Sequence, residues 1–167
     1  MPNHSIKNPN TEKERIAIVT ALRTPMARAG GKFKKMQADQ LGAVLFRELM
    51  MRSSVGVDEV DEVIIGNVIQ PSDAANIARV IALNGGVPRA TPAHTVHRNC
   101  ASGMQAVTDA AEKIQAGRAD VVLAGGVESM THAPLLFHDQ FRAAMAKLPK
   151  AKSSLLKSAR RFSKKSE

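Results

Sequence analysis

The sequence predicts an α/β protein with a mostly parallel sheet, because short apolar runs alternate with helical segments along the chain. The runs are rich in Val, Ile and Leu, which is typical of strands that are buried on both faces of a parallel sheet. The segments between them carry apolar residues at helical spacing or end at glycine, which commonly follows the last turn of a helix. This order favours parallel strands joined by right-handed crossovers.

Each element follows from a local pattern. A β-branched run at 15–22 comes first, followed by a loop at 26–36 that is rich in glycine and lysine. The loop lacks the glycine fingerprint of a dinucleotide or phosphate site, so we expect a surface loop. Asp39 is expected to cap the next helix, and Asp73 or Asn76 the one after it. The predicted strands are 15–22, 63–69, 93–97 and 119–124, and the predicted helices are 40–53, 76–83 and 100–116.

Length and composition suggest one globular domain with added ends. The chain has 167 residues, of which 44% are hydrophobic, and its single cysteine fits a reducing compartment. We expect 1–14 to be a disordered lead-in, 15–133 an α/β domain and 134–167 the start of a basic amphipathic segment. No apolar run is long enough to span a membrane, and the polar start does not resemble a signal peptide. The expected location is therefore cytoplasmic, with peripheral membrane contact through 134–167.

Cys100 is the candidate catalytic residue. It follows the predicted strand 93–97 and opens a predicted helix, and catalytic groups of parallel sheets lie beyond the carboxyl ends of strands. The unpaired N–H groups at a helix N-terminus favour a thiolate over a thiol. The small residues Ala101, Ser102 and Gly103 leave room for a carbonyl substrate and leave backbone N–H groups accessible to an oxyanion. The alternative is a buried structural cysteine, which is a common environment for this residue type.

Two motifs resemble the thiolase family: Val-His-Arg-Asn-Cys-Ala-Ser-Gly-Met-Gln at 96–105 and Ala-Gly-Gly-Val-Glu-Ser-Met-Thr at 124–131. The resemblance implies that Cys100 is the nucleophile that is acylated during thiolytic cleavage of 3-ketoacyl-CoA. The products are acetyl-CoA and a shortened acyl-CoA, as in fatty-acid β-oxidation. Met130 matches a family position near the acyl pocket, with ordinary packing as the alternative. Coenzyme A is then a co-substrate, and no cofactor is expected.

The resemblance covers residues 15 to about 165 and implies the N-terminal half of a two-half fold. Family members take the base, the acid and a second oxyanion site from the other half, in Gly-His-Pro, Cys-x-Gly and Asn-Glu-Ala-Phe motifs that this sequence does not contain. We therefore expect this chain to be inactive by itself. Two other interpretations stay open. One is a ketoacyl synthase of the same fold, and the other is a non-catalytic half-thiolase that acts as a membrane-binding or regulatory partner.

The histidines are weaker candidates. His97 precedes Cys100 by three residues and could replace the missing base, but a packing or hydrogen-bonding role is the stronger expectation. His94, His97, His132 and His138 lack the spacing of metal ligands, so we expect no metal site. Asn76 and Arg79 match a family helix near the subunit interface, which suggests a homo-oligomer; a solvated helix face is the alternative for Arg79.

The end of the chain is strongly basic. Residues 142–167 hold nine Lys and Arg and one Glu, whereas 1–141 carry a net charge of only +1. The apolar residues Phe137, Phe141, Met145 and Leu148 share one helical face. The segment 148–153 is similar to an insert in thiolases that form the β subunit of the fatty-acid-oxidation trifunctional complex.

This similarity implies an anionic membrane or the α subunit of an oxidation complex as a partner of the basic segment. A solvated face and a contact with coenzyme A are the alternatives. Nucleic acid is not expected, since phenylalanine is the only aromatic residue type in the chain.

Overall fold

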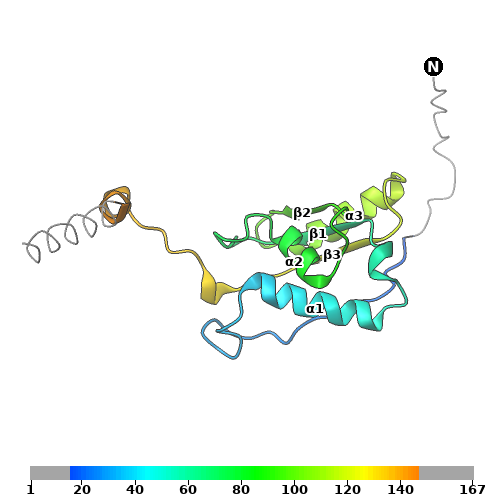
Figure 1. The fold of residues 1–167 in the computed structure, drawn as a ribbon, viewed down its shortest axis with the longest axis horizontal. Coiled ribbons are helices and arrows are strands. Elements are labelled where there is room, and N and C mark those ends of the chain that lie inside the picture. Colours follow the sequence, from blue (N-terminus) through cyan, green and yellow to red (C-terminus); the bar gives the residue numbers. More distant parts are fainter. Residues whose placement is uncertain (1–15, 147–167) are drawn as a thin grey trace, which may run out of the picture. The chain divides into compact units, whose positions relative to one another are not determined.

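The computed structural model describes residues 16–146, which fall into two compact units divided after Pro134. Three strands form one parallel sheet in the order β2-β1-β3, and helices alternate with them along the chain (Figure 1). The strands are β1 (Glu62–Gly66), β2 (Ala93–Val96) and β3 (Val122–Gly126). This arrangement confirms the predicted α/β class. The lead-in predicted at 1–14 lies outside the described residues.

Helices cover both faces of the sheet, so the described domain has three layers (Figure 1). Val63 and Ile65 of β1 pack into a cluster with Phe46 of α1 (Ala38–Arg52) and Ile81 of α2 (Ile77–Gly85). Ile64 points to the other face and packs against Ala106 and Ala110 of α3 (Ser102–Gln115). Successive side chains of a strand point to opposite faces of the sheet, so the apolar residues of β1 pack against helices on both faces.

The run predicted as a first strand at 15–22 is not a strand. Its described residues, 16–22, form neither strand nor helix, and Ile18 and Val19 are 78% and 66% exposed. Within residues 16–146 the run forms no hydrogen-bonded ladder with any strand. β1 is already paired on both sides, and the run pairs with neither β2 nor β3, which form the edges of the sheet. A run rich in β-branched residues favours an extended backbone, but it becomes a strand only where a neighbouring strand forms hydrogen bonds with it.

Helix ends follow local hydrogen bonds. α1 begins earlier than predicted, at Ala38, and its cap is Gln37 rather than Asp39, which lies in the first turn. The Gln37 N–H donates to the side-chain oxygen of Gln40 at 3.0 Å. Of the two predicted caps, Asn76 rather than Asp73 begins α2, and its side-chain oxygen accepts from the Arg79 N–H at 3.3 Å. α2 ends at Gly85 and is capped by Gly86, whose φ of 96° is left-handed and suits glycine.

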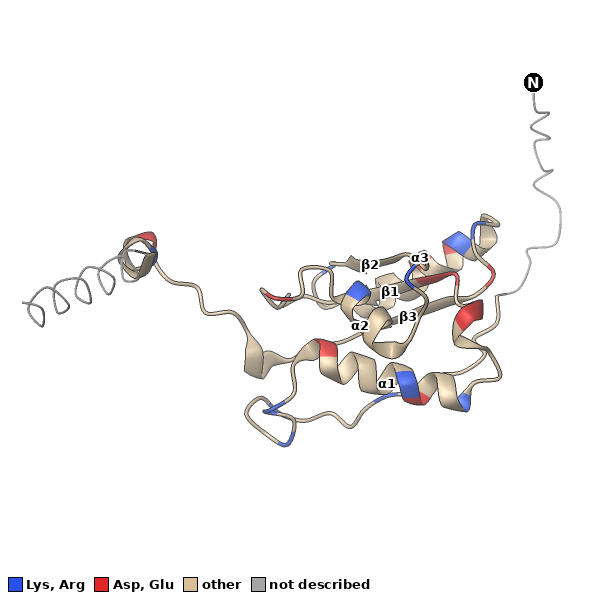
Figure 2. Cartoon of the chain, in the orientation of Figure 1, with Lys and Arg blue, Asp and Glu red and all other residues tan. Residues whose placement is uncertain are grey.

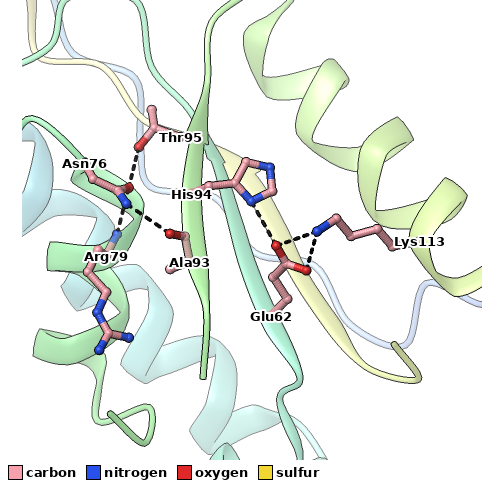
Figure 3. Close-up of polar contacts among 7 residues, drawn as sticks. All are labelled: Glu62, Asn76, Arg79, Ala93, His94, Thr95 and Lys113. Carbon is pink, nitrogen blue, oxygen red and sulfur yellow. Dashed lines mark hydrogen bonds and ion pairs between the residues drawn. The ribbon is translucent and has the colours of Figure 1, made fainter. Parts of the chain in front are cut away.

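Polar groups tie the first residues of the strands to the helices on each face (Figure 3). On one side, the Asn76 amide donates to the Ala93 carbonyl at 3.0 Å, and the Thr95 hydroxyl donates to the Asn76 side-chain oxygen at 2.9 Å. On the other, the Glu62 carboxylate accepts from Lys113 Nζ at 2.5 Å and from His94 Nδ1 at 2.9 Å. Glu62 therefore links β1, β2 and α3 at the end of the sheet opposite Cys100.

Asp61 joins β1 to the chain before β3. Its carboxylate accepts from the N–H groups of Asp120 at 2.7 Å and Val121 at 2.9 Å. The hydrogen bond from Val121, followed by that from Asp120, holds the pKa of Asp61 below its usual value of 3.8. The ionised form is thus favoured by folding, and this contribution is complete above the usual pKa.

We expect this contribution to disappear as pH falls through the lowered pKa of Asp61. Urea unfolding midpoints of Asp61→Asn should therefore fall less steeply than those of the parent chain below pH 3.8. Asp58→Asn, a change at a nearby exposed carboxylate, is the matched control. If the parent and Asp61→Asn lost stability in parallel on acidification, this assignment would be wrong.

The second unit is short in the described range. Residues 139–146 are helical, and the Phe137 and Phe141 rings lie together with centroids 4.7 Å apart. This agrees with a shared face for these two residues, whereas Leu148 and most of the basic residues lie outside the described range. In the first unit and these few residues, Lys, Arg, Asp and Glu are spread over helices and loops (Figure 2). None of the helices within 16–146 is both long and apolar enough to cross a bilayer.

Candidate active site

Cys100 lies in the turn that joins β2 to α3, and it is exposed. The prediction that it opens the helix is wrong by two residues, since α3 begins at Ser102 with Ala101 as its cap. The cause is the backbone of Asn99, whose φ of 48° is left-handed and interrupts the approach to the helix. Such a conformation is uncommon for residues other than glycine, and asparagine tolerates it better than most.

The turn uses some of the N–H groups that were expected to be accessible. Ala101 N–H donates to the Arg98 carbonyl at 3.1 Å, and Ser102 N–H donates to the Asn99 carbonyl at 3.0 Å. These two groups are therefore not available to an oxyanion, contrary to the prediction. Within residues 16–146, the N–H of Cys100 itself donates no hydrogen bond. The N–H of Gly103 has no acceptor in that range either, so Cys100 and Gly103 each offer an N–H group that an incoming oxyanion would find unpaired.

Glycines bring the start of α3 against the ends of two strands. A Cβ on Gly66 would overlap the carbonyl group of Ser102 and lie 2.5 Å from the Gly103 nitrogen. A Cβ on Gly126 would lie 3.0 Å from the Cα of Gly103. Real Cβ atoms essentially never approach other atoms as closely as at Gly66, so this packing requires glycine there. At Gly126 the contact is tight, and the backbone at Gly103 would have to move by a few tenths of an ångström to admit a Cβ. The close contact places Cys100 directly beyond the carboxyl edge of the sheet.

An open cavity of about 460 Å³ lies at this edge, which is within the usual range for small-molecule sites. Both predicted site residues, Cys100 and Met130, line it. Sequence-distant segments meet here, because the walls come from the ends of β1 and β3 and from the turn before α3. The lining residues are Gly66, Asn67, Val68, Ile69, Asn99, Cys100, Ser102, Gly103, Gly126, Val127, Glu128 and Met130. His97 is exposed and is not among them, which disfavours it as a base.

Glu128 fixes one wall of the cavity. Its carboxylate accepts hydrogen bonds from the Asn67 amide at 3.1 Å, from Val68 N–H at 3.0 Å and from Ile69 N–H at 3.2 Å. The Asn67 amide also donates to the Val127 carbonyl at 2.9 Å. With its oxygens occupied in this way, Glu128 holds the loop after β1 and is poorly placed to serve as a general base.

The segment that carries Met130 is anchored to the loop at 26–36. Gly30 N–H donates to the Thr131 hydroxyl oxygen at 3.0 Å, and the Ser129 hydroxyl donates to the Met36 carbonyl at 3.3 Å. His132 Nδ1 lies 3.0 Å from that same hydroxyl oxygen. His132 thus supports the Met130 segment, and the glycine- and lysine-rich loop is held at Gly30 and at Met36.

Other polar candidates have structural roles. Arg79 donates to the carbonyls of Thr91 and Arg89, both at 2.7 Å, and so holds the link that leads into β2. Among residues 16–146, no cluster of three His, Cys, Asp or Glu has the geometry of a metal site.

Two residues of this site, Asn67 and Ser102, were not predicted from the sequence. Asn67 is 1% exposed, and its side-chain oxygen has no hydrogen-bond partner in the described chain. The signal was an amide in an otherwise apolar run directly after Gly66. Ser102 was considered only for its small size, yet its buried hydroxyl bonds to the backbone on both sides of Asn99. A serine between two small residues carries no sequence signal for that role.

Comparison with known proteins supports the resemblance. A family model for the thiolase N-terminal domain matches residues 16–163. The chain is 43% identical over 122 residues to a "Probable acetyl-CoA acyltransferase" of Staphylococcus epidermidis, covering 73% of this chain and 31% of that protein. It is 41% identical over 125 residues to a protein of the same description from Staphylococcus aureus, covering 75% and 32%. The chain therefore spans about a third of the length of these curated relatives.

Solved structures agree with the sequence comparison. The acetyl-CoA acetyltransferase of Bacillus anthracis matches with a TM-score of 0.64 and 43% identity, over 66% of this chain and 28% of that one. The Acat5 thiolase of Ascaris suum, solved in complex with coenzyme A, matches with a TM-score of 0.67 and 33% identity, over 69% and 30%. By its sequence motifs and its fold, the chain belongs to the thiolase family and corresponds to the N-terminal domain of its members.

Proposed function

We propose that Cys100 is the acyl-accepting nucleophile of a 3-ketoacyl-CoA thiolase that functions in fatty-acid β-oxidation. The observation that carries this proposal is the position of the only cysteine, exposed on an open cavity at the carboxyl edge of the sheet. A thiol in a recess that admits a small molecule can reach a thioester substrate, whereas a buried structural cysteine could not. Met130, on the same cavity, would contact the acyl chain.

The proposed reaction has two covalent steps. The Cys100 sulfur attacks the 3-keto carbon of the substrate, and the oxyanion that forms accepts a hydrogen bond from the free Cys100 N–H. The carbon–carbon bond then breaks, its electron pair leaves with acetyl-CoA as an enolate, and a proton completes that product. The thiol of coenzyme A, acting as co-substrate, takes the acyl group from sulfur and returns a proton to the enzyme. No further cofactor enters these steps.

Proton transfer in both steps needs groups other than those around Cys100. Glu128 is occupied by three donors from the loop after β1, and His97 lies outside the cavity. We propose that the base, the acid and the second oxyanion site come from the part of a thiolase that lies beyond the region matched here. A positioned acid or base typically contributes about 10²–10⁴-fold, so this chain alone should show no measurable thiolysis.

The test combines mass spectrometry with an activity assay. The purified chain is incubated with a 3-ketoacyl-CoA, with and without the remaining two thirds of a thiolase supplied as a second polypeptide. We expect turnover only with the second polypeptide, an acylated form of the chain in the intact mass, and loss of both in Cys100→Ala. Turnover by the purified chain alone, lost in Cys100→Ala, would contradict the need for the second part. Turnover that survives Cys100→Ala would exclude Cys100 as nucleophile.

We also propose that residues 134–167 make a peripheral contact with an anionic surface, either a membrane or the α subunit of an oxidation complex. The support is the charge distribution, in which nine of the 24 Lys and Arg lie in residues 142–167. Each basic side chain near an anionic bilayer contributes about 1 kcal/mol, and salt screens the attraction. The family position of Asn76 and Arg79 further suggests a homo-oligomer.

We expect the chain to bind vesicles that contain anionic lipid, to release them as salt is raised, and to ignore neutral vesicles. Sedimentation with vesicles measures this directly. A chain shortened to residues 1–133 is the matched control and should not bind either type. Equal binding to neutral and anionic vesicles would count against an electrostatic contact.

A further inference from the structure

The hydroxyl group of Ser102 lies inside the turn that carries Cys100. Ser102 is 3% exposed, and its hydroxyl oxygen accepts from the Arg98 N–H at 2.8 Å. The same hydroxyl donates to the Asn99 carbonyl at 2.6 Å. One side chain therefore bonds to the backbone on each side of the peptide that joins Arg98 to Asn99. These bonds close the turn just before Cys100.

The turn needs such a closure because its backbone is unfavourable. Asn99 has a φ of 48°, in the left-handed region, where an L residue brings its Cβ close to the neighbouring backbone. Residues in this region persist where surrounding contacts determine them. The Ser102 hydroxyl and N–H both donate to the Asn99 carbonyl, and the same hydroxyl accepts from the Arg98 N–H. With the Ala101 N–H bond to the Arg98 carbonyl, these contacts hold the backbone before and after Asn99.

The position of Ser102 is set by the sheet. Its carbonyl group lies so close to Gly66 that a Cβ there would overlap it, and Gly103 packs against Gly126. The first turn of α3 therefore packs directly against the ends of β1 and β3. Because Ser102 is held against the sheet, its hydroxyl also fixes the backbone of Asn99, the residue before Cys100, relative to the sheet.

A second anchor acts on a side chain instead of the backbone. The Arg98 guanidinium donates to the side-chain oxygen of Gln105, whose amide donates to the Asp109 carboxylate at 2.5 Å. This chain of polar groups runs along α3 and holds the Arg98 side chain. It leaves the φ of Asn99 free to relax, so it does not replace the contacts made by Ser102.

We propose that Ser102 is a positioning residue for Cys100. Its hydroxyl holds Asn99 in the left-handed conformation, which keeps Cys100 on the cavity and its N–H group free of backbone acceptors. The inference rests on the proposed function, in that Cys100 is the group being positioned. Loss of the hydroxyl should let Asn99 move toward a more favourable conformation and carry Cys100 away from the start of α3. The reactivity of the thiol should then fall.

The test uses the rate at which iodoacetamide alkylates the intact chain, read by mass spectrometry across a range of pH. Cys100 is the only cysteine, so the mass change reports on one site. Ser102→Ala should slow alkylation at neutral pH severalfold, because the displaced thiol loses its place at the start of α3. Thr108→Ala removes an exposed hydroxyl from the same helix and should leave the profile unchanged.

Two further variants separate positioning from general stability. Glycine adopts left-handed φ without penalty, so Asn99→Gly combined with Ser102→Ala should recover the alkylation profile of the parent chain. Asn99→Val keeps the Ser102 hydroxyl but disfavours the turn, and it should slow alkylation as Ser102→Ala does. It also serves as the test if Ser102→Ala fails to fold.

The outcomes distinguish the two proposals. If the parent chain is alkylated faster than the urea-unfolded chain, and Ser102→Ala lowers the melting temperature but leaves the profile in place, then Ser102 is merely structural and the inference is overturned. If the folded parent is alkylated no faster than the unfolded chain, Cys100 is not activated in this chain, and the positioning inference falls with that result. A third outcome is that Cys100 is alkylated rapidly but the chain shows no thiolysis even with the second polypeptide. That result would support the positioning inference and contradict only the proposed reaction.

Discussion

Replacing Gly66 by alanine is expected to destabilise the chain by about 3 kcal/mol, at the upper end of the usual cost of overpacking. The added Cβ would overlap the Ser102 carbonyl group and lie 2.5 Å from the Gly103 nitrogen. Both are backbone atoms, so no flexible side chain can move aside. Either α3 shifts away from the sheet or the end of β1 bends. Urea unfolding, with the free energy extrapolated to water, measures the loss.

Gly125→Ala is the matched control for this experiment. Gly125 lies in β3 next to Gly126, yet a Cβ built on it meets no atom within 4 Å, and its φ is not left-handed. Alanine there should be neutral or slightly stabilising, because it reduces the freedom of the unfolded chain. An equal loss in the two variants would mean that close packing at Gly66 is not the cause.

Replacing Glu128 by alanine is the second large change, with an expected loss of about 3–5 kcal/mol. Three donors lose their acceptor: the Asn67 amide and the N–H groups of Val68 and Ile69. Hydrogen bonds to a charged acceptor are worth about 1.5–3 kcal/mol each, and water that enters the open cavity recovers part of this. The loop after β1 should therefore loosen while the sheet remains.

Amide hydrogen exchange provides the decisive measurement for Glu128. Exchange at Val68 and Ile69 should accelerate strongly in Glu128→Ala, whereas exchange in the middle of β1 should follow only the global loss of stability. Glu112→Ala, at an exposed position on α3, is the control and should leave both unchanged. Unaltered protection of Val68 and Ile69 would show that the carboxylate does not hold this loop.

Much of the fold could be predicted from the sequence because the deciding information is local. The apolar run at 63–69 predicted a buried strand, and Asn76 was one of two residues expected to begin α2. The run at 15–22 shows where local information fails. Its composition matches that of β1, but a strand also requires a partner, and no residue in the run indicates whether one is present.

The candidate site, too, could be predicted only in part. Cys100 could be placed beyond the sheet edge from the strand–helix order, because parallel strands bring their carboxyl ends to one edge. Met130 was expected near the same site only from the resemblance to the thiolase family, and both residues line the cavity. The functions of Asn99 and Ser102 could not be predicted, since a left-handed backbone and a hydroxyl that bonds across a turn leave no periodic pattern. The start of α3 was misplaced for that reason. Glu128 lies in the motif at 124–131, but the motif does not indicate that its carboxylate bonds to a loop about 60 residues earlier in the chain.

That sequence separation governs when the cavity can form during synthesis. The wall after β1 and the turn at Cys100 emerge from the ribosome before β3, and the carboxylate that fixes the wall comes only after Gly126. A nascent chain that has reached Cys100 therefore exposes its thiol without a completed recess around it. Closure of a long-range contact of this kind is slow relative to local helix formation. During that interval, the only cysteine of the chain is open to oxidants and to other thiols.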